Sequence, residues 1–141
     1  MKTIKNTIII LFAFLLASCS KDKQTLTDNT WIVESMKVYA DSVLQYPSAM
    51  NHRSITLSFP RISEYAFIME ANGCQGKVKL KNNYKINFSK ETMCTLVGGD
   101  SQFAEDCLSL LKNNINHYSI NDNKLILTGD NGETINFKKQ Q

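Results

Sequence analysis

Several motifs are missing from the sequence, and each absence removes a class of function. Its 141 residues contain no G-x-S-x-G of serine hydrolases, no P-loop G-x-x-x-x-G-K and no zinc-binding H-E-x-x-H. They contain no dense block of basic residues, which leaves a nucleic-acid-binding surface without support. Only two prolines occur and charged residues make up 21%, so the composition favours a folded domain over a disordered tail. We therefore predict a protein that is not an enzyme and has no catalytic residues, metal site or cofactor.

The N-terminus has the form of a secretory signal peptide. Two lysines precede an apolar run over residues 8–17, and no acidic residue occurs before Asp22. The run is shorter than the ~20 apolar residues that a membrane-spanning helix needs. It ends in Leu-Ala-Ser-Cys, which resembles the lipobox of bacterial lipoproteins. The resemblance implies a diacylglyceryl group on the thiol of Cys19 and cleavage by signal peptidase II between Ser18 and Cys19.

An ordinary cleaved signal with a coincidental cysteine, and an uncleaved anchor, remain the alternatives. Residues 1–18 are thus predicted to be removed, and the polar residues 19–25 to form a flexible tether. The segment after Cys19 loosely resembles the charged segment of Bacteroidetes lipoproteins. We expect a cell-envelope protein held by its lipid to a membrane, most simply the outer membrane, on its periplasmic or its surface face.

Removal of residues 1–18 leaves 141 − 18 = 123 residues, enough for one domain over residues 26–139. Lys2 and Lys5 leave with the signal, so 14 basic and 13 acidic residues remain and the net charge falls from +3 to +1. Of the four cysteines, Cys19 is assigned to the lipid, and the other three lie in a compartment that permits disulfides. Because three is an odd number, at most one disulfide forms within the chain.

The mature chain consists mostly of short alternating segments separated by turn residues. Strands are predicted over 31–38, 54–59, 65–71, 77–81, 85–89, 117–120, 124–128 and 134–138. One helix is predicted after a cap at Asp100 or Ser101, because Phe103, Ala104, Cys107, Leu108 and Leu111 recur at helical spacing. About seven or eight antiparallel strands with one covering helix predict a small β-barrel or half-barrel.

This order of elements resembles the META domain family (DUF306), which includes the HslJ-like lipoproteins. The resemblance is carried by the Trp31 strand, by Ile55-x-Leu57-x-Phe59, by the Asn-Gly-Cys-Gln-Gly segment at 72–76 and by the C-terminal strands. It implies a lipocalin-like antiparallel barrel in an envelope protein without a defined biochemical role. The family's second cysteine motif is only partly present, since Thr92-Met93-Cys94 matches a shortened form.

The resemblance favours a disulfide between Cys74 and Cys94, with Cys107 as the rival partner of Cys94. The alternative is three reduced, apolar cysteines. A metal site at Cys74, Cys94, Cys107, His52 and His117 lacks the usual ligand spacing. A Cys94–His117 nucleophile lacks a visible third group to orient the histidine.

Three functions remain open at this point. The first is a non-catalytic envelope domain that binds an unknown partner or maintains the envelope. The second is a lipocalin-type binder of a small molecule, for which a pocket of ~300 Å³ or more is expected. The third is a thiol-dependent enzyme. We expect Trp31, Tyr65, Phe67, Tyr84 and Phe88 to fill the core or a sheet face and not a ligand pocket.

Overall fold

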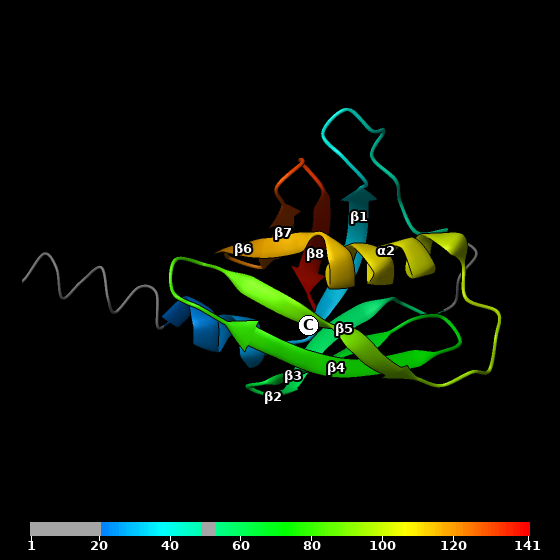
Figure 1. Ribbon diagram of the computed structural model, residues 1–141, viewed down its shortest axis with the longest axis horizontal. Helices are drawn as coiled ribbons and strands as arrows, with labels where there is room; N and C mark the ends of the chain where they lie inside the picture. The colour runs from blue at the N-terminus through cyan, green and yellow to red at the C-terminus, as the bar shows by residue number, and fades with distance from the viewer. Residues whose placement is uncertain (1–20, 49–52) are drawn as a thin grey trace, which may run out of the picture.

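Eight antiparallel strands form one sheet in the computed structural model, which describes residues 21–48 and 53–141. The strands are β1 (Trp31–Lys37), β2 (Thr56–Arg61), β3 (Glu64–Ile68), β4 (Gly73–Leu80), β5 (Ile86–Cys94), β6 (Ile115–Asn121), β7 (Lys124–Gly129) and β8 (Thr134–Lys139). One helix, α2 (Gln102–Asn113), lies between β5 and β6 in the chain. The predicted mainly-β half-barrel with a covering helix is confirmed (Figure 1).

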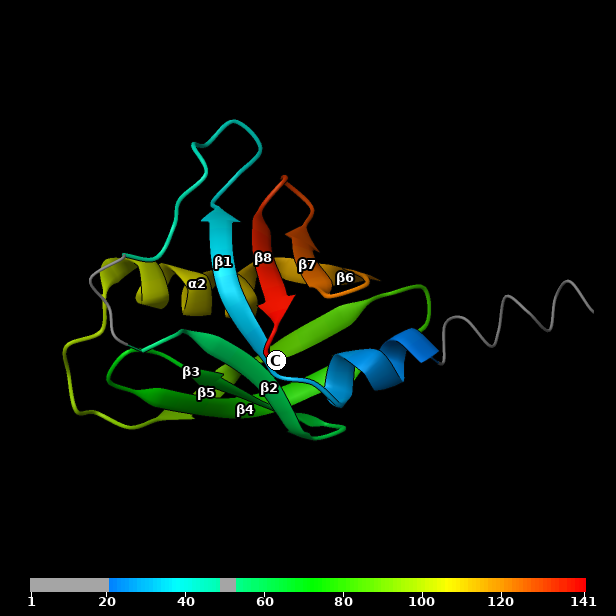
Figure 2. The same cartoon turned by 180° about the vertical axis from the view of Figure 1, so that it is seen from behind.

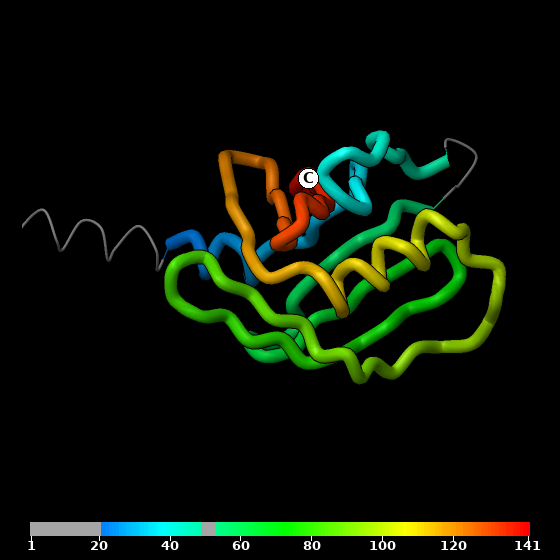
Figure 3. Tube along the Cα trace, turned by 45° about the horizontal axis from the view of Figure 1, so that its top comes forward, coloured from blue at the N-terminus to red at the C-terminus, as the bar shows by residue number. Residues whose placement is uncertain are grey.

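The sheet curls so that its two end strands approach each other. The strand order is β5-β4-β3-β2-β1-β8-β7-β6, which places β5 and β6 at the two edges. One isolated bridge joins Lys85 to His117, and the Tyr118 N–H donates to the Tyr84 carbonyl at 2.9 Å. Beyond this bridge, α2 runs alongside β5 before the chain enters β6 (Figure 3). The half-barrel is therefore closed partly by strand pairing and partly by the helix.

Aromatic and branched side chains on the inner faces of the strands fill the interior. Trp31, Tyr65, Phe67 and Phe137 are the largest of them, and each is at most 1% exposed. From α2, the side chains that join this core are Ala104, Cys107, Leu110 and Leu111. The aromatic residues expected in the core lie there, except that Tyr84 is only partly buried.

The helix α2 begins where its cap predicts. Ser101 has an extended backbone, and its hydroxyl accepts a hydrogen bond from the Ala104 N–H at 3.2 Å. This bond satisfies one of the amide groups that the first turn of a helix leaves without a partner. Glu105 in the first turn and Lys112 in the last turn both complement the helix dipole.

Three local predictions differ from the structure. Residues 21–25, assigned to a tether, belong to a helical segment over 21–27, because Leu26 is fully buried and its carbonyl accepts a hydrogen bond from Trp31 Nε1 at 2.9 Å. The Asn-Gly-Cys-Gln-Gly segment is not a turn, since its last four residues begin β4. Pro60 lies just beyond the predicted strand 54–59 but belongs to β2. The register between β2 and β3 is broken there, so the missing N–H of proline costs no hydrogen bond between the strands.

No helix of the described residues is long and apolar enough to cross a membrane.

Candidate functional site

A disulfide joins β4 to β5 at the end of the sheet from which the chain leaves for α2. Cys74 and Cys94 are direct cross-strand partners, and their sulfur atoms are 2.06 Å apart. The Cys74 side chain is fully buried, whereas Cys94 is exposed. This is the pair that the family resemblance favours. Cys107, the rival partner, lies in the core under α2, and its Sγ is 3.3 Å from the Met36 sulfur.

The loop after β5 is attached to the sheet through the side chain of Asn72. The Asn72 Oδ1 atom accepts hydrogen bonds from the Val97 N–H at 2.7 Å and from the Thr95 hydroxyl at 3.1 Å. The Thr95 N–H also donates to the Gly73 carbonyl at 3.0 Å. One asparagine therefore holds two positions of the loop, so that the loop has a defined conformation although its outer side faces solvent.

Asp100 fixes the other end of the loop to the same segment. Its carboxylate accepts hydrogen bonds from the Ala71 N–H at 2.7 Å, from the Asn72 N–H at 3.2 Å and from the Asn72 side-chain amide. Partial burial alone would raise the pKa of Asp100, but these three hydrogen bonds together outweigh it and lower the pKa. The carboxylate is therefore ionised at neutral pH, in the form that accepts these bonds.

Two glycines allow the chain to turn between the loop and the helix. Gly98 and Gly99 have φ values of 82° and 88°, a region that side chains with a Cβ rarely adopt. Next to them, the Ser101 hydroxyl donates to Glu70 at 2.6 Å, which joins the start of α2 to the end of β3. The glycine pair therefore gives the chain the conformational freedom that it needs just before the helix.

Three apolar side chains from the end of β5 and the loop after it project into solvent. Met93, Leu96 and Val97 are 79%, 96% and 77% exposed, and we call them the apolar rim. Exposed apolar residues scattered singly are ordinary on a protein surface, but three within five positions, Met93 near the end of β5 and two on the hydrogen-bonded loop after it, are not. The sequence contained a signal for them, since the apolar pair Leu96-Val97 stands in a predicted loop.

One known protein family matches this chain over almost all of its described residues. The model of the META domain matches residues 24–141. The chain belongs to the META domain family. A search of curated proteins finds no match.

Solved structures similar to this META domain support its fold. An NMR structure of a protein from Burkholderia xenovorans has a TM-score of 0.65 and 22% identity over 84% of this chain and 86% of that one. A crystal structure of a DUF4847 family protein from Bacteroides vulgatus has a TM-score of 0.60 and 16% identity, over 85% of this chain and 99% of that one. At these identities the likeness concerns the fold alone.

The other candidate residues of the META domain are not brought together. His117 pairs with Lys85 before the start of β5, whereas Cys94 ends the same strand, so roughly 30 Å of strand separates them. Burial raises the pKa of the Cys107 thiol, which keeps it protonated. Among residues 21–48 and 53–141, no three His, Cys, Asp or Glu side chains form a group able to hold a metal ion. Ser18, Cys19 and His52 lie outside the described residues.

A groove of about 320 Å³ lies on the surface where β4 and β5 lose their regular register. Its lining includes Tyr65, whose buried hydroxyl has no hydrogen-bond partner in the described chain. Burial raises the pKa of Tyr65 to about 12. A glycine is required opposite this ring, because a Cβ at Gly76 would lie 2.7 Å from the Tyr65 ring. The groove is a surface feature, since side chains fill the barrel interior.

Proposed function

We propose that this protein is a lipid-anchored envelope lipoprotein whose META domain is a non-catalytic binding module, and that it contacts a protein partner through the apolar rim. The observation that carries the proposal is the rim itself. Met93 near the end of β5, with Leu96 and Val97 on the loop after it, exposes apolar area on a segment that a disulfide, Asn72 and Asp100 hold in place. A surface ordered before binding loses little conformational entropy when a partner covers it.

The position of the rim supports the same proposal. The helical segment 21–27, which follows the predicted lipid-bearing Cys19, lies at the β4–β5 turn, at one end of the molecule. The loop that carries the rim lies at the other end, eight residues of β4 away, or about 25 Å (Figures 1 and 2). A domain anchored at the first end presents the rim away from the bilayer, where a partner can reach it.

Photo-crosslinking in cells tests the rim. A photoreactive residue at Leu96 is expected to yield a discrete adduct, and Val97→Asp is expected to abolish that adduct by placing a charge in the contact. Val43→Asp is the matched control, because Val43 is a valine of similar exposure, 82%, in a different loop. Both variants should unfold at the wild-type temperature, since neither side chain is buried. No adduct, or equal loss in both variants, would contradict the proposal.

The groove beside Tyr65 supports a second candidate, a binder of small molecules. Its volume reaches the ~300 Å³ typical of such sites, and a ligand that displaces the groove wall gains a hydrogen bond from the Tyr65 hydroxyl, which is buried and has no partner among the described residues. If this candidate holds, small polar fragments that raise the unfolding temperature of the wild type will lose this effect in Tyr65→Phe. Fragments that stabilise both proteins equally, or none that stabilise the wild type, would exclude it.

A further inference from the structure

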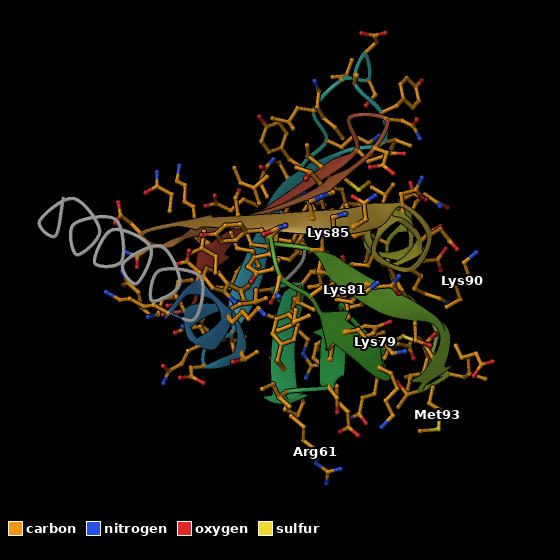
Figure 4. The ribbon with its side chains drawn as sticks, turned by 60° about the vertical axis from the view of Figure 1, so that its left-hand side comes forward. Arg61, Lys79, Lys81, Lys85, Lys90 and Met93 are labelled. Carbon is orange, nitrogen blue, oxygen red and sulfur yellow. A yellow bond between two sulfur atoms is a disulfide. The ribbon has the colours of Figure 1, made fainter. Side chains whose placement is uncertain are left out.

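The outer face of the β4–β5 hairpin carries three lysines without an acidic partner. Lys79, Lys81 and Lys85 are exposed, whereas Val78 and Ile86, which flank them in the sequence, are buried. None of the three forms an ion pair within residues 21–48 and 53–141, although Lys77 on the same strand lies 2.7 Å from Glu64. We call these three lysines the basic tip; they lie over the hairpin in Figure 4.

Two lysines of the basic tip repel each other in the folded protein. The Lys81 N–H donates to the Lys85 carbonyl at 2.9 Å, so the two residues are cross-strand neighbours. Like charges at directly opposite positions of a sheet lower its stability. Placing these two lysines opposite each other therefore does not stabilise the fold. An anion bound in front of the hairpin would interact favourably with both.

The start of the mature chain is tied to this same hairpin. The Tyr84 hydroxyl donates to the Asp22 carboxylate at 2.9 Å, and Lys23 Nζ donates to Asn82 Oδ1 at 3.2 Å. Tyr84 also adopts a φ of 57°, which is unusual for a bulky residue, and its ring packs edge-on against Tyr118 at 5.6 Å. The helical segment and the hairpin turn thus form one unit.

The length of chain before this unit limits how far it can lie from a membrane. Asp22 follows Cys19 by three positions, and an extended chain spans at most about 3.5 Å per residue. A lipid on Cys19 would hold Asp22 within about 10 Å of the bilayer surface, close to the Debye length of physiological salt. The hairpin turn would be held with it.

We infer that the basic tip docks on the anionic phosphates of lipid headgroups and so orients the anchored domain on its membrane. This inference rests on the proposed lipid anchor at Cys19. Lys21 and Lys23 add positive charge to the same end of the molecule, and Asp22 and Asp28 on the helical segment offset part of it. Exposed lysines close to an anionic bilayer strengthen binding by about fivefold each.

An apolar contact adjoins these charges. A groove of about 800 Å³ lies between the helical segment and the β2–β3 turn, and its lining combines apolar residues such as Ile62 and Leu80 with polar residues of the helical segment and with Lys79 and Lys81. Ile62 at its border is 78% exposed. Basic residues beside exposed apolar ones are the combination by which peripheral proteins bind the headgroup region.

Vesicle binding by the full mature chain without its lipid tests the inference. At low salt, vesicles of phosphatidylglycerol and phosphatidylcholine should bind the protein, and vesicles of phosphatidylcholine alone should not. Lys79→Gln, Lys81→Gln and Lys85→Gln combined should weaken binding about 100-fold. The triple variant should unfold at the wild-type temperature or above it, because the repulsion between Lys81 and Lys85 is removed.

Lys85→Gln and Lys90→Gln form a matched pair. Both remove one charge from an exposed lysine, but Lys85 directly precedes β5 at the hairpin turn, whereas Lys90 lies five residues further along, where the pairing of β5 with β4 is irregular. The affinity for the anionic vesicles should fall about fivefold in Lys85→Gln and should hardly change in Lys90→Gln. Equal losses, binding to both kinds of vesicle or no binding at all would overturn the inference. Since no lipid is attached in this assay, these results are independent of whether Cys19 is acylated in cells, which mass spectrometry reports separately.

Discussion

Replacing Cys19 with alanine is expected to move the protein completely from the membrane fraction to the soluble fraction. The thiol is the only atom to which the diacylglyceryl group could be attached at the predicted cleavage site. Each methylene of an acyl chain contributes about 0.8 kcal/mol on insertion, so two or three chains hold a protein durably. In this variant Ala17, Ser18 and the substituted position also form an A-x-A site, which ordinary signal peptidase can cut.

Fractionation and mass spectrometry of the N-terminus measure this result. Ser18→Ala serves as the control, because it keeps a small residue before Cys19 and should leave the protein acylated and membrane-bound. The expected wild-type mass is that of a chain beginning at Cys19 with its acyl groups. An intact signal peptide without acyl mass, or retention of a cleaved Cys19→Ala protein on membranes washed with high salt to screen the basic tip, would refute the lipid anchor.

Removing the disulfide, by reduction or by Cys74→Ala with Cys94→Ala, is expected to lower the free energy of unfolding by about 3 kcal/mol. The bond closes a loop of 20 residues, and the loss of its constraint on the unfolded chain accounts for an effect of this size. For a domain of this length, about 3 kcal/mol corresponds to a fall of roughly 10 °C in the unfolding temperature. The loop that carries the apolar rim should also exchange its amide hydrogens faster, because one of its attachments is lost.

Thermal unfolding with and without dithiothreitol checks the disulfide, with Cys107→Ala as the control. That variant loses a buried thiol but keeps the disulfide, so dithiothreitol should lower its unfolding temperature by as much as in the wild type. In Cys74→Ala with Cys94→Ala, the reductant should have no effect. Three titratable thiols in the denatured, non-reduced mature protein would show that the bond is absent, because denaturation also exposes the buried Cys107 thiol.

The two ends of the domain explain how these predictions fit together. The helical segment, the hairpin turn and the basic tip lie at the end that the lipid anchor would hold. The disulfide, Asn72 and Asp100 hold the apolar rim at the other end. Reduction of the disulfide should thus weaken partner binding without affecting vesicle binding, and neutralisation of the basic tip should do the reverse.

Elements with a strong period were predictable from the sequence. The spacing of Ala104, Cys107 and Leu111 located α2, and Ser101 caps it as expected. The alternation of Ile55, Leu57 and Phe59 located the β2 region, and all three are buried. Such predictions succeed because neighbouring residues in one element report its periodicity directly.

Elements whose stability comes from distant contacts were not predictable. The segment 21–27 contains one leucine among polar residues, and its helix is held by Trp31, Tyr84 and Asn82. Asn72 was visible only as part of a turn motif, but two loop groups separated from it by more than 20 residues converge on its side chain. No local pattern encodes such a convergence.

The sequence by itself predicted a lipoprotein-type signal, a net charge of +1 with three cysteines besides Cys19 after cleavage, and about eight strands with one helix. Short-range spacing and composition carry that information. Only the tertiary structure decided that Cys74 faces Cys94 while Cys107 is buried, that three apolar side chains face solvent, and that the hairpin turn contacts the helical segment 21–27. These relations depend on strand register and on the curl of the sheet, which join residues 20 to 62 positions apart.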